Sequence, residues 1–245
     1  MKFKFRYALI ALVVILLIAV GGFMIWASNP LGPGEQSLAA LESDSFVTVE
    51  QGNFIIFQPT DVQPSTGFIF YPGGRVDYRS YAPALREIAA QGYLVVLVPA
   101  PLNLMVFNPS AADEVLPQFP QIEHWAIGGH SLGGAMAANY VYTHPDAVDG
   151  LVLWASYPAS NNDLSGSGLP VLSIYGTLDM AGMGKFEESR ALLPEDTTWV
   201  VIEGGNHAQF GDYGFQPGDN AATISAADQQ AQIVDATVMF LAGLE

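Results

Sequence analysis

The sequence of 245 residues has no cysteine and few charged side chains. The absence of cysteine excludes a disulfide framework, a thiolate zinc site and a cysteine nucleophile. Basic residues are especially scarce, since eight lysines and arginines stand against 24 aspartates and glutamates, for a formal net charge of −16. A surface this acidic argues against binding to nucleic acid and against docking on anionic lipid. Half of the residues are hydrophobic, so we expect a substantial buried core.

The longest uncharged stretch lies near the N-terminus, behind three of the eight basic residues, and runs from Ala8 to Trp26. Its length matches the roughly 20 residues that a helix needs to cross a bilayer. The basic flank predicts that the N-terminus stays in the cytoplasm while the rest of the chain lies outside. A cleaved signal peptide with Ala27 at the cleavage site, which would leave a secreted protein, is the alternative. The stretch is longer than a usual signal core and no A-x-A motif stands behind it, which favours a retained anchor.

The chain is therefore predicted to have four segments. A basic cytoplasmic tail (1–7) precedes a transmembrane anchor or uncleaved signal (8–26). A linker (27–40), rich in proline and glycine at its start, leads into a globular domain (41–245).

Short apolar segments alternate with helical ones in the globular part. Two apolar segments on either side of Gln51-Gly52 predict an antiparallel hairpin. Further strands are expected at 67–71, 93–98, 125–127, 151–154, 169–175 and 199–203, and helices at 81–91, within 108–123, at 135–142, 185–193 and 225–244. This order predicts an α/β protein with a doubly wound, mostly parallel sheet behind an antiparallel start.

A hexapeptide, Gly129-His130-Ser131-Leu132-Gly133-Gly134, stands where a predicted strand meets a predicted helix. A serine between glycines at such a turn is typical of the nucleophile elbow, G-x-S-x-G. Glycines are needed there because the turn is sharp and the strand and helix approach closely. The turn would hold Ser131 at the positive end of a helix, where free N–H groups can receive an oxyanion.

A serine hydroxyl becomes a nucleophile only when a base removes its proton. The chain has four histidines. The side chain of His130, inside the elbow, should point away from that of the serine. His124 precedes the elbow strand and His144 ends a helix. His207 lies in a loop directly after the last predicted strand, and it is therefore the predicted base.

The base needs an acid to orient it, and the acid should follow a strand between the serine and the histidine. Asp179 does so, a few residues after the strand at 169–175. Asp163 is an alternative, but it lies in a polar loop and is expected to be solvated. Asp146 and Asp149 flank a helix-to-strand turn and are expected at the surface.

Two N–H donors are needed for the tetrahedral oxyanion. One is assigned to the backbone of Leu132 and the other to Gly74, in the glycine turn after the strand at 67–71; an ordinary turn is the alternative there. Arg75 could hold a substrate carboxylate or phosphate, or form a structural salt bridge. Phe210, in the aromatic-rich loop after the predicted base, could wall the pocket or pack the loop onto the body.

From Gly67 to the C-terminus the chain resembles the α/β-hydrolases, specifically the small, lidless type related to dienelactone hydrolases. The elbow, Tyr175–Asp179 and Gly205–Gly211 carry the resemblance. It implies the α/β-hydrolase fold, with Ser131 as nucleophile, His207 as general base and acid, and Asp179 as its orienter.

Two departures from the family pattern matter. Dienelactone hydrolases have cysteine where this chain has Ser131, which puts that substrate in doubt. Tyr71-Pro72 stands where many members have His-Gly, which leaves the second oxyanion donor the weaker assignment. The gap from Ala155 to Gly168, where caps are usually inserted in this fold, is too short for a helical cap, so an open site is expected.

The sequence thus predicts a membrane-anchored, extracytoplasmic serine hydrolase that cleaves small-molecule carboxyl esters through an acyl-enzyme, with no metal or other cofactor. Acyl transfer to another acceptor and cleavage of amides or thioesters use the same triad and stay open as alternatives. A catalytically silent surface binding module is the alternative from a different class.

Overall fold

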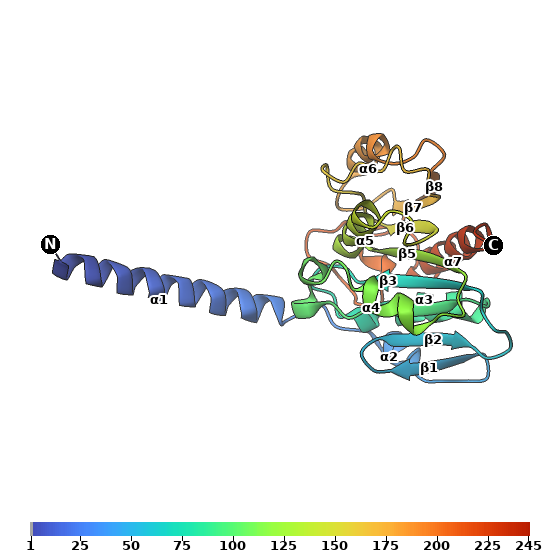
Figure 1. The fold of residues 1–245 in the computed structure, drawn as a ribbon, viewed down its shortest axis with the longest axis horizontal. Coiled ribbons are helices and arrows are strands. Elements are labelled where there is room, and N and C mark those ends of the chain that lie inside the picture. Colours follow the sequence, from blue (N-terminus) through green and yellow to red (C-terminus); the bar gives the residue numbers. More distant parts are fainter. Residues whose placement is uncertain (1) are drawn as a thin grey trace.

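The structure, a computed structural model, describes residues 2–245, so Met1 of the predicted basic tail lies outside the described residues. A long helix, α1 (Lys2–Ala27), projects from a body that is built on one eight-stranded sheet (Figure 1). Residues 6–27 of this helix are long and apolar enough to cross a membrane by length and composition. The side chains from Arg6 to Trp26 are exposed, whereas Ala27 is fully buried against the body.

The sheet confirms the predicted hairpin and the mostly parallel arrangement. Its strands are β1 (Val47–Gln51), β2 (Ile55–Pro59), β3 (Thr66–Tyr71), β4 (Leu94–Leu97), β5 (His124–His130), β6 (Gly150–Trp154), β7 (Val171–Gly176) and β8 (Thr198–Ile202). They lie side by side in the order β1-β2-β4-β3-β5-β6-β7-β8. β2 is antiparallel to both β1 and β4, and every other neighbouring pair is parallel.

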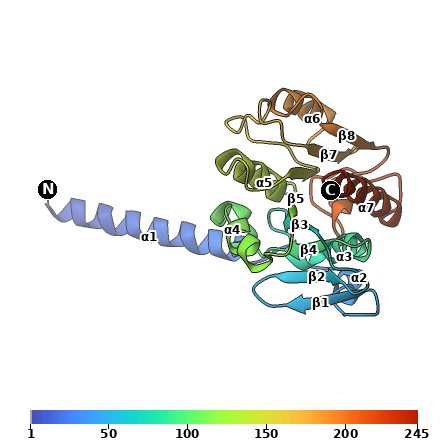
Figure 2. The same cartoon turned by 45° about the vertical axis from the view of Figure 1, so that its right-hand side comes forward.

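Helices cover both faces of the sheet. They are α2 (Glu35–Ala39), α3 (Ala82–Ala90), α4 (Ala112–Val115), α5 (Leu132–Thr143), α6 (Met183–Ser189) and α7 (Ala226–Ala242). Short 3₁₀ turns join them, at η1 (Tyr78–Tyr81), η2 (Pro101–Asn103), η3 (Met105–Phe107), η4 (Leu116–Gln118), η5 (Arg190–Leu192) and η6 (Ala208–Phe210). Figure 2 shows α3 and α7 on one side of the sheet and α4 and α5 on the other.

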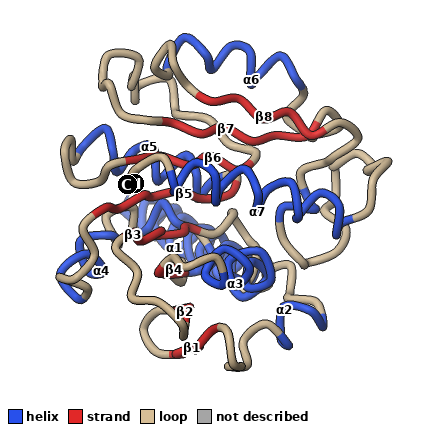
Figure 3. The backbone as a smooth tube through the Cα atoms, turned by 90° about the vertical axis from the view of Figure 1, so that its right-hand side faces the viewer, coloured by secondary structure: helices blue, strands red, loops and turns tan. Residues whose placement is uncertain are grey.

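Successive strand residues face opposite layers, and both layers are apolar. On β3, Phe68 and Phe70 belong to the core beneath α3 and α7, while Ile69 and Tyr71 belong to the core beneath α4 and α5. All six residues of β3 are buried as a result. This two-sided burial explains why the parallel strands appear in the sequence as unbroken apolar runs rather than as alternating patterns. Figure 3 shows the strands in succession, from β8 at the top to β1 at the bottom.

The segment between α1 and the sheet runs against the body instead of hanging free. Leu31 forms a parallel bridge with Val76. The Gly34 N–H donates to the main-chain oxygen of Asp212 (2.7 Å), and the Ser37 N–H donates to the carboxylate of the same aspartate (2.8 Å). The proline- and glycine-rich linker is therefore an ordered strap, and its status as a domain boundary stays a prediction.

Candidate active site

The elbow serine sits in a strained turn between β5 and α5. Its φ of 52° and ψ of −120° lie outside the regions that residues with a Cβ normally adopt. Hydrogen bonds on both sides hold the turn: the Ser131 N–H donates to the Trp154 carbonyl (3.0 Å), and the Ser131 carbonyl accepts from Ser156 Oγ (2.6 Å). Strain of this kind persists only where the surroundings enforce it, which is common at functional sites. The hydroxyl is thereby turned out of the strand.

The elbow needs glycines because the main chain of neighbouring segments leaves no room for a Cβ atom. A Cβ at Gly133 would collide with the main chain of Tyr71 and Pro72, at the end of the neighbouring strand β3. A Cβ at Gly129 would meet the Tyr71 carbonyl and the first turn of α5. The elbow therefore lies directly against the loop that follows β3.

Asp179 and His207 come together from the loops after β7 and β8. His207 Nδ1 lies 2.8 Å from Asp179 Oδ2, and the two side chains are 6% and 0% exposed. The other carboxylate oxygen accepts from the Ala181 N–H (2.8 Å). Because an ionised carboxylate only accepts hydrogen bonds, the proton of the imidazole sits on Nδ1. Nε2 is left with a free lone pair.

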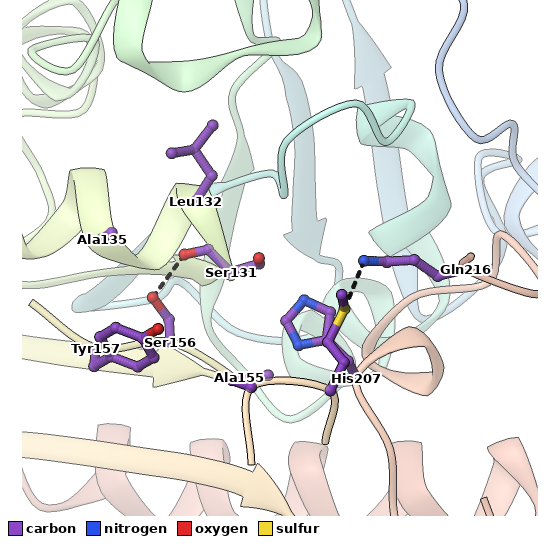
Figure 4. A pocket seen from close by; sticks show the side chains of 10 residues that line it. Ser131, Leu132, Ala135, Ala155, Ser156, Tyr157, His207 and Gln216 are labelled. Atoms are coloured by element: carbon purple, nitrogen blue, oxygen red, sulfur yellow. Dashed lines mark hydrogen bonds between the residues drawn. The ribbon is translucent and has the colours of Figure 1, made fainter. Parts of the chain in front are cut away.

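A cavity of about 420 Å³ brings the serine and the histidine into one space. Figure 4 shows the Ser131 hydroxyl and the His207 ring, both facing this cavity. In residues 2–245 no hydrogen bond joins the two, as is common in ligand-free sites, where such contacts tighten when substrate binds. The lining residues are Ser131, Leu132, Ala135, Ala155, Ser156, Tyr157, Met180, Ala181, His207 and Gln216.

Both assigned oxyanion donors stand beside the elbow. Leu132 is the first residue of α5, so its N–H has no acceptor within the helix. Gly74 packs against Leu132, because a Cβ built on the glycine would lie 3.0 Å from the leucine Cδ2. The N–H of Gly73 is occupied, since it donates to the Tyr81 hydroxyl (3.0 Å). Gly74 rather than Gly73 is the donor that the geometry leaves available, and the assignment stays a prediction.

His130 is buried behind the site. The sequence predicted that its side chain points away from that of the serine. Nδ1 of His130 is 2.8 Å from the Tyr81 hydroxyl, and the ring centroid is 4.5 Å from that of His207. Burial, together with the nearby His207, holds the pKa of His130 well below its usual value, although the main chain of His207 opposes the shift. His130 is therefore neutral.

Tyr81 links this histidine to the loop after β3. Burial raises the pKa of Tyr81, so its hydroxyl stays protonated. It accepts from the Gly73 N–H and shares a second hydrogen bond with His130 Nδ1. No spacing in the sequence signals this bridge, because Tyr81 belongs to a short turn that only the fold brings under the elbow.

Arg75 does not reach the cavity. Its Nε donates to the Trp26 carbonyl (3.1 Å) and its Nη2 to the Asn29 carbonyl (2.9 Å), and the guanidinium lies 4.4 Å from the centroid of the Trp26 ring. Arg75 forms no salt bridge among the described residues, and a contact with substrate stays a prediction. The arginine fastens the end of α1 instead.

Phe210 packs the loop onto the body, which is one of the two places that the sequence left open for it. It is fully buried, and its ring stacks on His130 with centroids 5.6 Å apart and an interplanar angle of 14°. The same loop sends Gln216 into the cavity, where its amide donates to the Met180 sulfur (3.2 Å). Sequence inspection missed both residues, because neither belongs to a motif.

The remaining alternatives lie elsewhere. Asp163 is exposed and accepts from the Ser165 N–H (3.0 Å), with no contact to His207 among the described residues. Asp146 and Asp149 line a different cavity, at the end of α5. Within the described chain, no group of three or more histidine, aspartate or glutamate residues is arranged to hold a metal ion.

Comparisons with known proteins agree with this architecture. The model of the alpha/beta hydrolase family matches residues 67–231. A search of curated proteins finds no match.

Among solved structures, TT1662 from Thermus thermophilus is 15% identical, with a TM-score of 0.58 over 81% of this chain and 98% of that one. A thermostable esterase from Pseudomonas putida is 16% identical, with a TM-score of 0.57 over 85% and 87%. Esterase Est2 from Thermogutta terrifontis is 16% identical, with a TM-score of 0.54 over 86% and 96%. These likenesses show the fold, and the narrower tie to dienelactone hydrolases stays a prediction.

Proposed function

The chain belongs to the alpha/beta hydrolase family, and from that premise we propose that it is a serine hydrolase that cleaves carboxyl esters through an acyl-enzyme. Ser131 is the nucleophile, His207 the general base and acid, and Asp179 the residue that orients the imidazole. One observation carries the proposal: a buried aspartate–histidine pair opens onto the same cavity as a serine held in a strained elbow.

The reaction follows from the free lone pair on His207 Nε2. That nitrogen takes the hydroxyl proton as Ser131 Oγ bonds to the ester carbonyl carbon, and the oxyanion is received by the N–H groups of Leu132 and Gly74. The intermediate collapses, and the imidazolium gives its proton to the departing alkoxide. Water then attacks the acyl-enzyme by the same route and releases the acid. Asp179 stays ionised and stabilises the imidazolium throughout.

Similarity of the fold to solved esterases favours esters over other acyl compounds as substrates. Solved relatives from Pseudomonas putida and Thermogutta terrifontis are described as esterases. The cavity is bordered by short loops and by no inserted helical cap within residues 155–168, which supports an accessible site. Acyl transfer is distinguished from hydrolysis by adding a competing alcohol and analysing the products.

We also propose that α1 is retained as a membrane anchor with the body outside the cytoplasm. The basic residues precede the apolar stretch, the arrangement that keeps an N-terminus in the cytoplasm. Cleavage at Ala27 would remove a residue that is fully buried against the body, which supports retention.

The test is the Ser131→Ala variant, assayed on a small chromogenic ester and with a fluorophosphonate probe that reacts only with activated serines. We expect kcat/KM to fall by at least about 1,000-fold and labelling to vanish, while the circular dichroism spectrum is unchanged. Ser167→Ala is the matched control, because Ser167 lines a cavity of similar size elsewhere. Undiminished turnover in Ser131→Ala would refute the mechanism, and a wild-type chain that the probe does not label would favour a silent binding module.

A further inference from the structure

The end of α1 is fastened to the body at several points. Arg75 donates to the carbonyls of Trp26 and Asn29, and Asn103 Nδ2 donates to the Ala27 carbonyl (2.9 Å). Carbonyls at a helix C-terminus have no partners within the helix, so these side chains complete it. Because Ala27 is also fully buried, the helix joins the body without a spacer.

The length of the helix then fixes where the body lies. The apolar span from Arg6 to Ala27 has 22 residues, which corresponds to about 33 Å of helix against a hydrocarbon core of about 30 Å. Almost the whole span is needed to cross the bilayer. Trp26 consequently falls at the interface, where tryptophan is enriched, and the residues bonded to it lie at the level of the headgroups.

The edge of the sheet that meets α1 is the edge that carries the candidate active site. Arg75 follows the carboxyl end of β3, and Asn103 follows the carboxyl end of β4, which is parallel to β3. The elbow follows β5 at the same edge. Figure 1 shows α1 leaving the body on this side. The cavity therefore opens on the membrane-facing edge.

Apolar side chains are exposed on this edge. Val106 and Phe107, in η3, are 45% and 52% exposed, and the Phe107 ring makes an edge contact with Phe23 of α1 at a centroid distance of 6.3 Å. Met180 and Phe215, on the loops after β7 and β8, are 42% and 75% exposed, and Met180 lines the cavity. Since Phe23 belongs to the apolar span, the occupant that covers Phe107 beside it is lipid.

We infer that the loops after β3, β4, β7 and β8 rest on the bilayer around α1, with Phe107 among the lipid headgroups and acyl chains. The substrate class follows: esters with long acyl chains that partition into the membrane and enter the cavity from its surface. The substrate class rests on the proposed ester hydrolase function, and the docking of this edge rests only on the proposed membrane anchor. The tether holds the body at the surface, so the acidic chain needs no anionic lipid for docking.

Docking is tested without any assay of activity. The chain has no cysteine, so Phe107→Cys can carry a single environment-sensitive fluorophore. The full chain is reconstituted into phosphatidylcholine vesicles that contain nitroxide-labelled lipid. Phe46→Cys is the matched control, because Phe46 is 63% exposed and precedes β1 at the opposite edge of the sheet.

We expect the lipid nitroxide to quench the label at position 107 and to leave the label at position 46 bright, with no further change when anionic lipid is added. Equal quenching at the two positions, or none at 107, would overturn the inference. The inference would also be overturned if, in detergent, the label at 107 became shielded from solvent only when the chain dimerises. The face would then be an interface between two copies.

The substrate class is tested with two esters in the same vesicles, soluble p-nitrophenyl butyrate and a membrane-embedded long-chain ester, p-nitrophenyl palmitate. Phe107→Ser should lower turnover of the embedded ester by at least about fivefold and leave the soluble ester unaffected, while Phe46→Ser changes neither. Failure of the wild-type chain on both esters would count against the proposed function. Full turnover of the embedded ester by Phe107→Ser, with the soluble ester still cleaved, would count against membrane delivery alone.

Discussion

Two histidine–aspartate pairs lie at different ends of the helix that follows the elbow, and only one of them belongs to the candidate active site. Near the start of α5, His207 Nδ1 is 2.8 Å from Asp179, with side chains 6% and 0% exposed. At the end of α5, His144 Nε2 is 3.6 Å from Asp113, with side chains 34% and 52% exposed. Each histidine lines a cavity, of about 420 and 400 Å³ respectively.

Residue types and cavity size alone therefore do not make a candidate active site. The outer pair is partly solvated, so water competes with the carboxylate for the imidazole. The inner carboxylate is removed from water and must be satisfied by the protein, which fixes the imidazole in one orientation. Only the inner histidine faces a strained serine at a helix N-terminus.

The largest difference should come from the two aspartates. Asp179→Asn should lower kcat on a soluble ester by about 10,000-fold, because an amide no longer selects the tautomer with a free Nε2. Asp113→Asn should stay within about twofold of wild type, since its partner faces solvent. Steady-state kinetics on both variants measures this contrast. Comparable losses in the two would mean that burial does not distinguish the pairs.

The next contrast uses two tyrosine hydroxyls. Tyr81→Phe leaves the Gly73 N–H and His130 Nδ1 without a partner, which should cost about 1–3 kcal/mol in the free energy of unfolding. The loop that carries Gly74 also loosens, so kcat should fall about tenfold with little change in KM. Tyr81 acts here as a positioning residue.

Tyr140→Phe is the control, because its hydroxyl donates to the exposed Asp113 (2.7 Å) and that carboxylate can turn to water. Its loss should cost about 1 kcal/mol or less, with kcat unchanged. Denaturant unfolding and kinetics on both variants decide the matter. If Tyr81→Phe lost only stability, the bridge would hold up the fold without positioning the oxyanion loop.

A third contrast concerns pH. Burial holds the pKa of His130 well below 6.5 in the folded chain, whereas the unfolded chain titrates near the ordinary value. The unfolded state therefore binds the extra proton first, so the stabilisation is complete above pH 6.5 and is lost as the pH falls below it. The melting temperature should drop on acidification, and less steeply in His130→Gln. An unchanged slope in His130→Gln would assign the acid sensitivity to other groups.

Local sequence sufficed to predict that Ser131, Asp179 and His207 lie at one site, because each follows a strand, whereas their catalytic roles stay a prediction. Carboxyl ends of parallel strands meet at one edge, so strand order alone predicts that Ser131, Asp179 and His207 approach one another. The apolar runs also predicted the strands and the hairpin to within a few residues.

Contacts between distant loops could not be inferred in this way. The sequence left Arg75 either a substrate contact or a structural salt bridge, because it stands beside the oxyanion loop. Its partners are instead main-chain carbonyls more than 40 residues earlier, on α1 and the strap. Phe210 was placed on the pocket wall or the body with equal reason, since an aromatic residue in a glycine-rich loop fits both. Whether Phe210 lies on the pocket wall or on the body depends on the path of the loop, which places its ring on that of His130.

The smallest expected effect is the coupling within the outer pair itself. A double-mutant cycle of His144→Ala and Asp113→Ala should give a coupling free energy of about 0.5 kcal/mol or less, falling further in high salt because exposed charges are screened. The same cycle on His207 and Asp179 should give several-fold more, since removing either partner leaves a buried group unsatisfied. The cycles are measured by chemical denaturation at two salt concentrations. Equal, salt-insensitive coupling free energies would show that the exposed pair, 3.6 Å apart, interacts as strongly as the buried pair, 2.8 Å apart. The serine alone would then distinguish the two ends of α5.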